Sequence, residues 1–280
     1  MRLEPQVAFT KPASDIALIG HAYPSSQERT EGLVGIRVGS VQKLARVFGN
    51  RRLVKRLGFS TLTAPELFDR IPLTYEHAFG GWDRRDKNPE KHRFEPRNPV
   101  GIGYRDPDLS GDTDVPMPNL EDPDHLVKSA SDRPPPAGFG FIAPDWQPRA
   151  RFAGTYDKAW NDQRKPLLPK DFDRRFFNAA SPGLIFPGHL RGDEPVVVIG
   201  ATASGRVSFN LPGLAAPACR LVLKSGKPVE LQALLDTLVV DMDRQTVTMT
   251  WRAHATVRRG IHDVVALELP PQQPPPPDDD

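Results

Sequence analysis

Proline is the feature that most restricts how this chain can fold. The sequence has 31 prolines and 22 glycines among its 280 residues, and the share of proline is about twice the usual ~5%. A proline inside a helix costs ~3 kcal/mol, because it removes a backbone donor and clashes with the preceding turn. The composition therefore excludes a helix bundle and favours strands joined by long, defined loops.

Two stretches of the chain, residues 10–59 and residues 195–269, carry the β-branched or alternating runs that are typical of strands. Within them we expect strands at 15–23, 33–38, 43–48, 195–200, 207–211, 219–224, 229–231, 238–242 and 246–253. Gly39-Ser40-Val41-Gln42 is predicted to be a compact hairpin connection. The strand over 246–253 alternates, which places Val247, Met249 and Trp251 on one buried face.

Helices are expected to be few and short. Residues 64–69 follow Thr63 as an N-cap and have Pro65 at the first helical position, so they are predicted to form one or two helical turns. A second short helix is expected to end at Leu234-Leu235. We expect a solvated loop face, with a phosphate or acidic-partner patch as the alternative, at Arg51, Arg52, Lys55 and Arg56.

The section between the two strand-rich stretches, residues 60–194, has Pro, Gly, Asn or Asp in almost every window. Such composition is common in disordered chains, but aromatic residues are spread through the whole section. One aromatic side chain can bury ~150–250 Å², and a structureless loop of this length is uncommon inside a domain. We therefore predict an ordered insertion that aromatic anchors hold on a sheet.

These patterns together predict a mainly β protein with antiparallel, sandwich-like sheets, a long ordered loop insertion and few short helices. We expect a single β-rich domain over residues 1–270, with the insertion at 60–194. The tail over residues 271–280 is rich in proline and aspartate. It is predicted to be a flexible polyproline II segment outside the core.

Composition excludes several classes of function. The formal net charge is +2, which is not the footprint of a general nucleic-acid binder. The single cysteine, Cys219, excludes an intrachain disulfide framework and a Cys-rich zinc site, and it is expected to be a small buried hydrophobe. The sequence shows no secretory signal and no run of ~18 apolar residues. We therefore expect a cytoplasmic protein without a membrane partner.

Motifs for catalysis, cofactors or metals are weak. Residues 200–207 have the glycine spacing of a phosphate-binding loop, but they lack its lysine and its hydroxyl residue. The seven histidines form no metal-binding pair of the H-E-x-x-H type. Asp171 and Asp173 are expected to form salt bridges with Arg174-Arg175 rather than an acid–base pair. We therefore expect no catalytic residue, no cofactor and no metal.

Several segments resemble, in order, an accessory family of bacterial type VI secretion systems that was first catalogued as a domain of unknown function. Residues 72–81 resemble its PL-x-YE-x-AFGG motif. The other segments that resemble its motifs, over roughly residues 10–255, are Lys11-Pro12 with Asp15, 98–103, 116–123, 136–140 with Trp146 and Arg149 or Arg151, 154–160, 169–178, 211–213, 236–238 and Trp251-Arg252.

One departure from the family pattern lies at the start of the chain. Members commonly carry a further β-rich stretch ahead of the segment that corresponds to Lys11-Pro12, whereas about ten residues precede it here. We expect either a short member or a trimmed chain. In both cases a sheet edge is expected to be exposed or completed by a partner.

The resemblance implies a non-enzymatic cytoplasmic adaptor, or chaperone, of type VI secretion. Such a protein binds a cognate effector, which is expected to present its PAAR-like or N-terminal region. It promotes the loading of that effector onto the VgrG spike with its PAAR-type tip. The resemblance implies no catalytic residues.

Aromatic and arginine side chains dominate the energetics of protein interfaces. We therefore expect partner-binding anchors in the loop section at Tyr75, Trp82, Tyr104, Trp146, Arg149, Tyr156 and Trp160. The alternative for each of these side chains is a place in the core. Two other classes of function stay open: a carbohydrate-binding β module with coplanar exposed rings, and a hydrolase with a site near Glu76 and His77.

Overall fold

A computed structural model describes residues 10–25, 27–56, 59–109, 113–226, 228–257 and 260–269. Over these residues the fold is mainly β, as predicted, with a single α-helix, α1 (Lys158–Gln163). The short 3₁₀ turns are η1 (Tyr75–His77), η2 (Pro89–Lys91), η3 (Arg149–Phe152), η4 (Arg174–Phe177) and η5 (Ile261–Asp263). The predicted tail at 271–280 lies outside the described residues.

The largest sheet is antiparallel, with the strand order β13-β4-β3-β15-β16. Its strands are Leu120–Glu121, Val41–Phe48, Glu31–Val38, Pro195–Ile199 and Arg206–Asn210. Alternate residues of β3, such as Val34, Ile36 and Val38, are buried. The connection between β3 and β4 is shorter than predicted, because Gly39 adopts a φ of +54° that allows a tight turn and β4 already begins at Val41.

The second sheet has the order β14-β1-β19-β20. Its strands are Ile185–Phe186, Ser14–Ile19, Leu234–Asp241 and Thr246–Arg252. β1 pairs with β19 in parallel, an exception to the predicted antiparallel arrangement, because these strands come from opposite ends of the chain and no hairpin joins them. The expected helix at Leu234-Leu235 is wrong, since both residues pair with β20.

Both sheets and the loop section contribute to one hydrophobic core. Ile16 of β1, Ile36 of β3 and Leu238 of β19 meet there. Phe139, from the loop section, is fully buried in the same cluster. The loop section is therefore ordered, and aromatic side chains hold it on the sheets, as its composition predicted.

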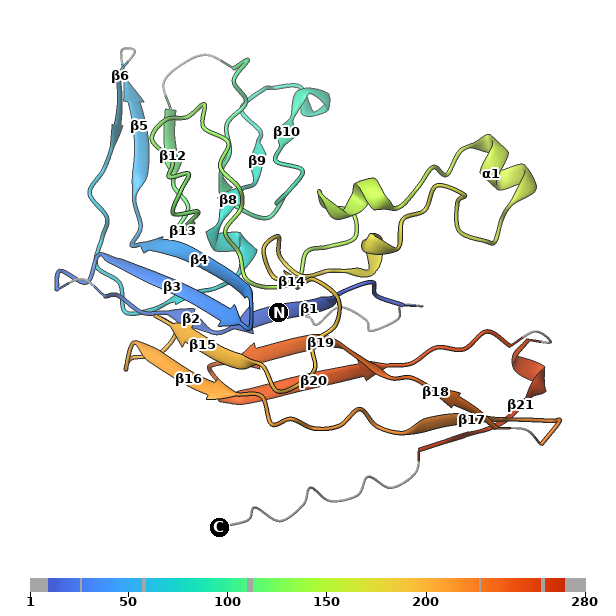
Figure 1. Ribbon diagram of the computed structural model, residues 1–280. Coiled ribbons are helices and arrows are strands. Elements are labelled where there is room, and N and C mark those ends of the chain that lie inside the picture. The colour runs from blue at the N-terminus through green and yellow to red at the C-terminus, as the bar shows by residue number, and fades with distance from the viewer. Residues whose placement is uncertain are drawn as a thin grey trace, which may run out of the picture.

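Smaller sheets stand on one side of this core (Figure 1). A three-stranded sheet has the order β12-β5-β6, with strands Thr113–Pro116, Arg52–Arg56 and Phe59–Leu62. Two two-stranded pairs lie on the same side, β8 (Phe79–Gly80) with β11 (Ile102–Gly103) and β9 (Trp82–Asp83) with β10 (Arg93–Phe94). A third pair, β2 (His21–Ala22) with β7 (Ile71–Pro72), lies at the core and contributes Ala22 and Ile71 to it. Three residues of the basic group that was expected to form a loop, Arg52, Lys55 and Arg56, therefore lie in strand β5, and Arg51 directly precedes it.

Residues 64–69 form no helix, which corrects the prediction made from Thr63 and Pro65. The backbone amide of Glu66 donates to the Asn50 carbonyl, and that of Phe68 donates to the Arg29 carbonyl. These amides therefore satisfy their hydrogen bonds on neighbouring segments, where a helix would need them internally.

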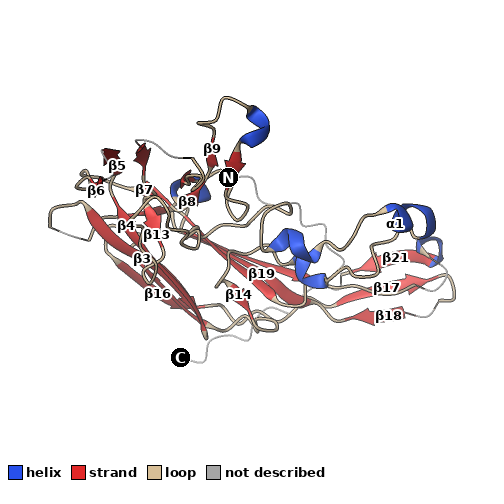
Figure 2. Cartoon of the chain, turned by 90° about the horizontal axis from the view of Figure 1, so that it is seen from above, coloured by secondary structure: helices blue, strands red, loops and turns tan. Residues whose placement is uncertain are grey.

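Two elements extend from the same end of the molecule in both views (Figures 1 and 2). One is the segment that carries α1. The other is a three-stranded sheet with the order β18-β17-β21, formed by Pro228–Leu231, Cys219–Leu223 and Val264–Glu268. Cys219 is half-buried rather than fully buried, and β21 was not among the predicted strands.

Candidate functional site

Two of the predicted anchors, Tyr75 and Trp146, pack against each other. Tyr75 is 5% exposed, and its ring meets the partly buried Trp146 edge-on, with ring centroids 5.5 Å apart. The Tyr75 hydroxyl donates to Ser181 Oγ at 2.7 Å, and burial raises the pKa of Tyr75 above its usual range. The structure corrects the expectation for Tyr75, because most of the ring packs in the core and is not an exposed anchor.

Arg149 is also an interior residue, at 4% exposed. Its Nε donates to the Phe176 carbonyl at 2.7 Å and one terminal nitrogen donates to the Ile142 carbonyl at 2.8 Å. The guanidinium thus joins two loop backbones that lie far apart in sequence. This corrects the expectation for Arg149: its donors are used inside the protein, where an interface anchor would present them to a partner.

Trp82 and Tyr104 differ in accessibility. Trp82 is 42% exposed and stacks on Phe94 with ring centroids 4.4 Å apart. Tyr104 is partly buried against a second core cluster, and the Arg133 guanidinium lies 4.9 Å from its ring centroid. Trp82 therefore stays available to a partner, whereas most of Tyr104 serves local packing.

Tyr156 and Trp160 lie together on the projecting segment that we call the α1 arm, residues 154–173. Asp157 caps α1, since its carboxylate accepts from the Trp160 amide at 2.8 Å. Trp160 Nε1 donates to the Leu167 carbonyl at 2.8 Å, and the Tyr156 and Trp160 rings meet edge-on at 4.7 Å. These contacts give the tip of the arm a defined shape.

The base of the α1 arm is closed by polar contacts. Thr155 donates to the Asp171 carboxylate from its amide at 3.0 Å and from its hydroxyl at 2.8 Å, and these bonds hold the pKa of Asp171 below its usual range. Asp173 forms the predicted salt bridge with Arg175. The amide of Asp173 also donates to the Phe152 carbonyl at 3.0 Å, which brings the two ends of the arm together.

The order of the α1 arm does not serve the core. None of the residues of α1 is buried, while Tyr156 is 53% and Leu167 is 62% exposed. A segment that fixes its own conformation and then presents apolar side chains to solvent has the geometry of a partner-binding element. The arm is our candidate functional site.

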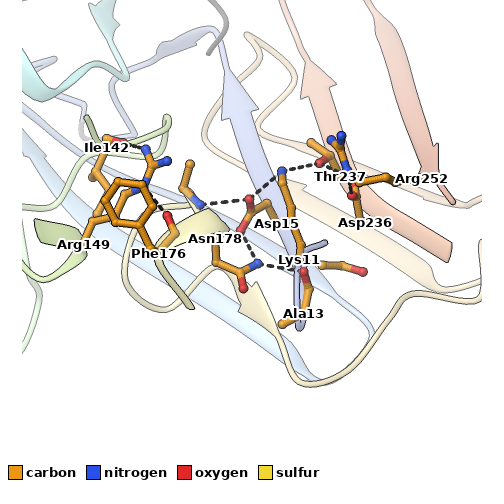
Figure 3. A network of polar contacts seen from close by, with 12 residues as sticks. Lys11, Ala13, Asp15, Ile142, Arg149, Phe176, Asn178, Asp236, Thr237 and Arg252 are labelled. Atoms are coloured by element: carbon orange, nitrogen blue, oxygen red, sulfur yellow. Dashed lines mark hydrogen bonds and ion pairs between the residues drawn. The ribbon is translucent and has the colours of Figure 1, made fainter. Parts of the chain in front are cut away.

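A buried polar network joins the first strand to distant segments (Figure 3). Lys11 Nζ donates to Asp15 at 2.9 Å and to Thr237 Oγ1 at 2.7 Å. Asp15, fully buried, also accepts from Asn178 Nδ2 at 2.9 Å and from the Ala179 amide at 3.0 Å. Segments that resemble separate family motifs thus meet in one network.

Asp236 and Arg252 extend this network. Arg252 Nε donates to the Asp236 carboxylate at 2.5 Å, and Thr237 Oγ1 donates to the same residue at 2.8 Å. Asp236 is only 1% exposed, so each charge depends on its partner. We assign this network a structural role, because its charged groups are occupied by one another.

A cavity of about 700 Å³ lies elsewhere, beside strand β4. Its lining includes the charged residues Lys43, Arg97, Asp122, Asp124 and Arg151 together with several prolines. Lys43 is the notable group, because burial lowers its pKa to about 7, partly opposed by Asp122.

Lys43 also touches a hydroxyl cluster that could be taken for a reaction centre. A serine beside a lysine of lowered pKa is a pair that some hydrolases use. Lys43 Nζ donates to Ser181 Oγ. Ser181, however, is fully buried and donates to the Gly138 carbonyl at 2.8 Å. Its hydroxyl is therefore committed to holding loop backbone, and a substrate has no approach to it in this structure.

The predicted alternative site at Glu76 and His77 does not bring two titratable groups together. Glu76 is exposed, whereas His77 Nδ1 is hydrogen-bonded to Asn119 Oδ1 at 2.9 Å. Over the described part of the chain, no group of three or more His, Cys, Asp or Glu side chains is placed to hold a metal ion. Within the same residues, no helix is long and apolar enough to cross a membrane.

Sequence reasoning missed Lys43 and Ser181. A signal for Lys43 was present, since it shares a strand face with Ala45 and Val47, both fully buried, and a lysine on such a face is unusual. No comparable signal in the sequence indicated Ser181, because a serine followed by Pro182 and Gly183 is typical of an ordinary turn.

Comparison with known protein families gives a match over most of the chain. The model of a family described as "Uncharacterized protein conserved in bacteria (DUF2169)" matches residues 1–252. The match includes the polar network, the cavity and the α1 arm, and it ends before β21. No curated protein and no solved structure shows a significant match.

Proposed function

The chain belongs to the DUF2169 family of uncharacterized bacterial proteins, and we propose that it is a non-enzymatic cytoplasmic adaptor of type VI secretion. In this proposal it binds a cognate effector through the effector's PAAR-like or N-terminal region. It then promotes the loading of that effector onto the VgrG spike. The proposal takes the secretion system from the motif resemblance and the mode of action from the geometry.

The observation that carries the proposal is the α1 arm. Hydrogen bonds of Asp157, Trp160 and Thr155 fix its conformation, yet its most exposed apolar residues, Tyr156 and Leu167, stay 53% and 62% exposed. Rigid apolar side chains bind with little loss of conformational entropy, which is what an interface anchor requires. The segments at 154–160 and 169–178, which resemble family motifs, build this arm.

The β18-β17-β21 sheet adds a second exposed apolar surface at the same end of the molecule. Val265, Leu267 and Leu269 alternate along the chain and are 63%, 59% and 67% exposed. β21 is also an edge strand of its sheet, so a strand of a partner could pair with it. An effector that spans both elements would bury more surface than either one provides.

The geometry favours protein binding over the two alternatives. The rings of Tyr156 and Trp160 lie 71° apart, so they do not form the coplanar platform that a carbohydrate-binding module needs. The groups that could support hydrolysis, at Ser181 and at His77, are held in hydrogen bonds to the protein itself.

The experiment that tests the proposal is co-purification with the effector and spike proteins encoded beside this chain. Tyr156→Ser combined with Leu167→Ser removes the apolar tip and leaves the hydrogen bonds of Asp157 and Trp160 in place. We expect at least a tenfold loss of effector retention. Leu67→Ser, at a position that is 75% exposed outside the arm, is the matched control and should retain the effector.

Two results would contradict the proposal. One is failure of the unchanged chain to retain the effector or the spike at low salt. The other is equal retention by the arm variant and the control variant, which would move the binding surface away from the α1 arm.

A further inference from the structure

The cavity beside β4 is built from several separate segments of the chain. It lies where β4 meets the loops at 122–124, 135–137, 147–151 and 182–183. Five of its lining residues are prolines, namely Pro123, Pro135, Pro136, Pro148 and Pro182. A proline offers a rigid apolar surface and no backbone N–H, so these walls can hold an apolar group but cannot donate a hydrogen bond to an anion.

Positive charge on the cavity wall is only partly neutralised. Arg97 forms a two-point interaction with Glu95, with distances of 2.7 and 2.8 Å. Lys43 and Arg151, among the described residues, form no salt bridge, and the Arg151 guanidinium lies 4.7 Å from the Phe152 ring centroid. Two cations therefore face this cavity without a salt-bridge partner among the described residues, although Asp122 acts on Lys43 from a longer distance.

Lys43 has spare hydrogen-bonding capacity. An ammonium group has three donors, and within the described part of the chain Nζ of Lys43 donates to Ser181 Oγ and, at 3.1 Å, to the Pro182 carbonyl. Asp122 lines the cavity but lies beyond salt-bridge distance. Burial lowers the pKa of Lys43 to about 7, and a carboxylate placed beside it would stabilise its charged form.

The acids of the cavity restrict what can enter. Asp122 and Asp124 lie on the wall, and Asp122 already accepts from the Asp124 amide at 2.9 Å. Their charges disfavour a run of acidic residues, so at most one carboxylate, held by Lys43, fits among them. The ligand that fits has one acidic group flanked by apolar surface.

We propose that this cavity binds a single Asp or Glu side chain of the partner polypeptide, with the carboxylate on Lys43 and apolar neighbours against the proline walls. The identity of the occupant rests on the proposed adaptor function, since a polypeptide partner supplies it. The cavity then acts as a specificity site separate from the α1 arm.

Two blocked peptides test this inference, acetyl-Phe-Glu-Phe-amide and acetyl-Phe-Gln-Phe-amide. They have nearly the same shape and differ in the carboxylate. We expect the unchanged protein to bind the Glu peptide at least tenfold more tightly than the Gln peptide by calorimetry. The NMR signals of the Lys43 side chain should shift only with the Glu peptide. Equal affinities, or no measurable binding of the Glu peptide at millimolar concentration, would overturn the inference.

Three single-residue variants test which side chains produce the preference for the Glu peptide. Lys43→Met should bring the two affinities to within about twofold of each other. Arg151→Met, at an exposed position where the fold is not at risk, should reduce the preference about threefold. Lys87→Met, also exposed, removes the same charge from another place and should keep the full preference. A preference that survives both Lys43→Met and Arg151→Met would contradict the assignment.

Effector retention separates this inference from the proposed function. If the adaptor function is wrong, the unchanged chain retains no effector, whatever the peptides do. If only the cavity inference is wrong, the unchanged chain and Lys43→Met retain the effector equally. Retention that falls at least tenfold in Lys43→Met, together with loss of the preference for the Glu peptide, supports both.

Discussion

At the scale of single residues, the buried charge of Asp15 has the largest expected effect on stability. Its carboxylate accepts from Lys11, Asn178 and the Ala179 amide. Asp15→Asn leaves the Lys11 ammonium buried without its ion-pair partner, so we expect a loss of about 3–5 kcal/mol in the free energy of unfolding. Urea denaturation at neutral pH measures this loss.

The control for this prediction is Asp162→Asn. Asp162 pairs with Lys158 at the surface, where the two side chains are 46% and 88% exposed, so its loss should cost no more than about 0.5 kcal/mol. Similar losses for the two variants would show that the network around Asp15 does not stabilise the fold as the contacts imply.

The lowered pKa of Lys43 predicts that the stability of the protein depends on pH. This pKa falls from 10.5 to about 7 because burial disfavours the charged ammonium. Between these pH values the folded state binds fewer protons than the unfolded state, so the stability of the protein rises with pH across this window. Below about pH 7 both states are protonated, and this group contributes no pH dependence there.

Lys43→Met removes this dependence. The difference in free energy of unfolding between the unchanged protein and the variant should stay flat below pH 7. Above it the unchanged protein should gain at most about 1.4 kcal/mol per pH unit relative to the variant. Urea denaturation at about pH 6 and about pH 9 measures the difference. Parallel stability profiles for the two proteins would mean that Lys43 titrates normally in the fold.

At the scale of elements, two segments that resemble family motifs interlock. Asn98 Nδ2 donates to the carbonyls of Tyr75 and Phe79, and the Gly81 amide donates to the Asn98 carbonyl at 2.8 Å. Gly81 has a φ of +91°, and a Cβ at this position would overlap the Gly101 carbonyl oxygen. Glycine is therefore needed at Gly81 both for its backbone conformation and for the space it leaves.

Gly81→Ala and Gly188→Ala separate these two requirements. Gly188 has a similar φ of +77°, but a Cβ there would meet nothing within 4 Å, so its substitution should cost about 1–2 kcal/mol. Gly81→Ala should cost at least about 1–2 kcal/mol more, since the backbone must shift. Thermal melting of the two variants measures the difference between their losses of stability. Equal costs would show that the two segments do not pack as closely as described.

The longer strands of the central sheets were predictable from local patterns, a continuous β-branched run at residues 195–199 and an alternating run at residues 246–252, whereas the two-residue strands β13 and β14 were not predicted. The extended course of residues 64–69 was not predictable, because their amides bond to Asn50 and Arg29, contacts that no local pattern encodes. The same limit applies to the site. The motif at 154–160 marked Tyr156 and Trp160, but only the fold shows that Tyr75 and Arg149 are interior while Tyr156 projects.

At the scale of the whole molecule, the hydrophobic core lies apart from the proposed binding end. One core joins both central sheets and the loop section. The α1 arm and the β18-β17-β21 sheet extend beyond it on the same side (Figure 2). In the proposed function, these two elements present a defined surface to the effector.

Hydrogen exchange on the complex with the effector shows whether the α1 arm is the surface that the effector covers. The account predicts that backbone amides of residues 155–168 exchange more slowly in the complex than in the free protein. Amides of residues 64–69, outside the arm, should exchange at the same rate in both states. Unchanged exchange along the arm, with protection confined to other segments, would contradict the claim that the α1 arm binds the effector.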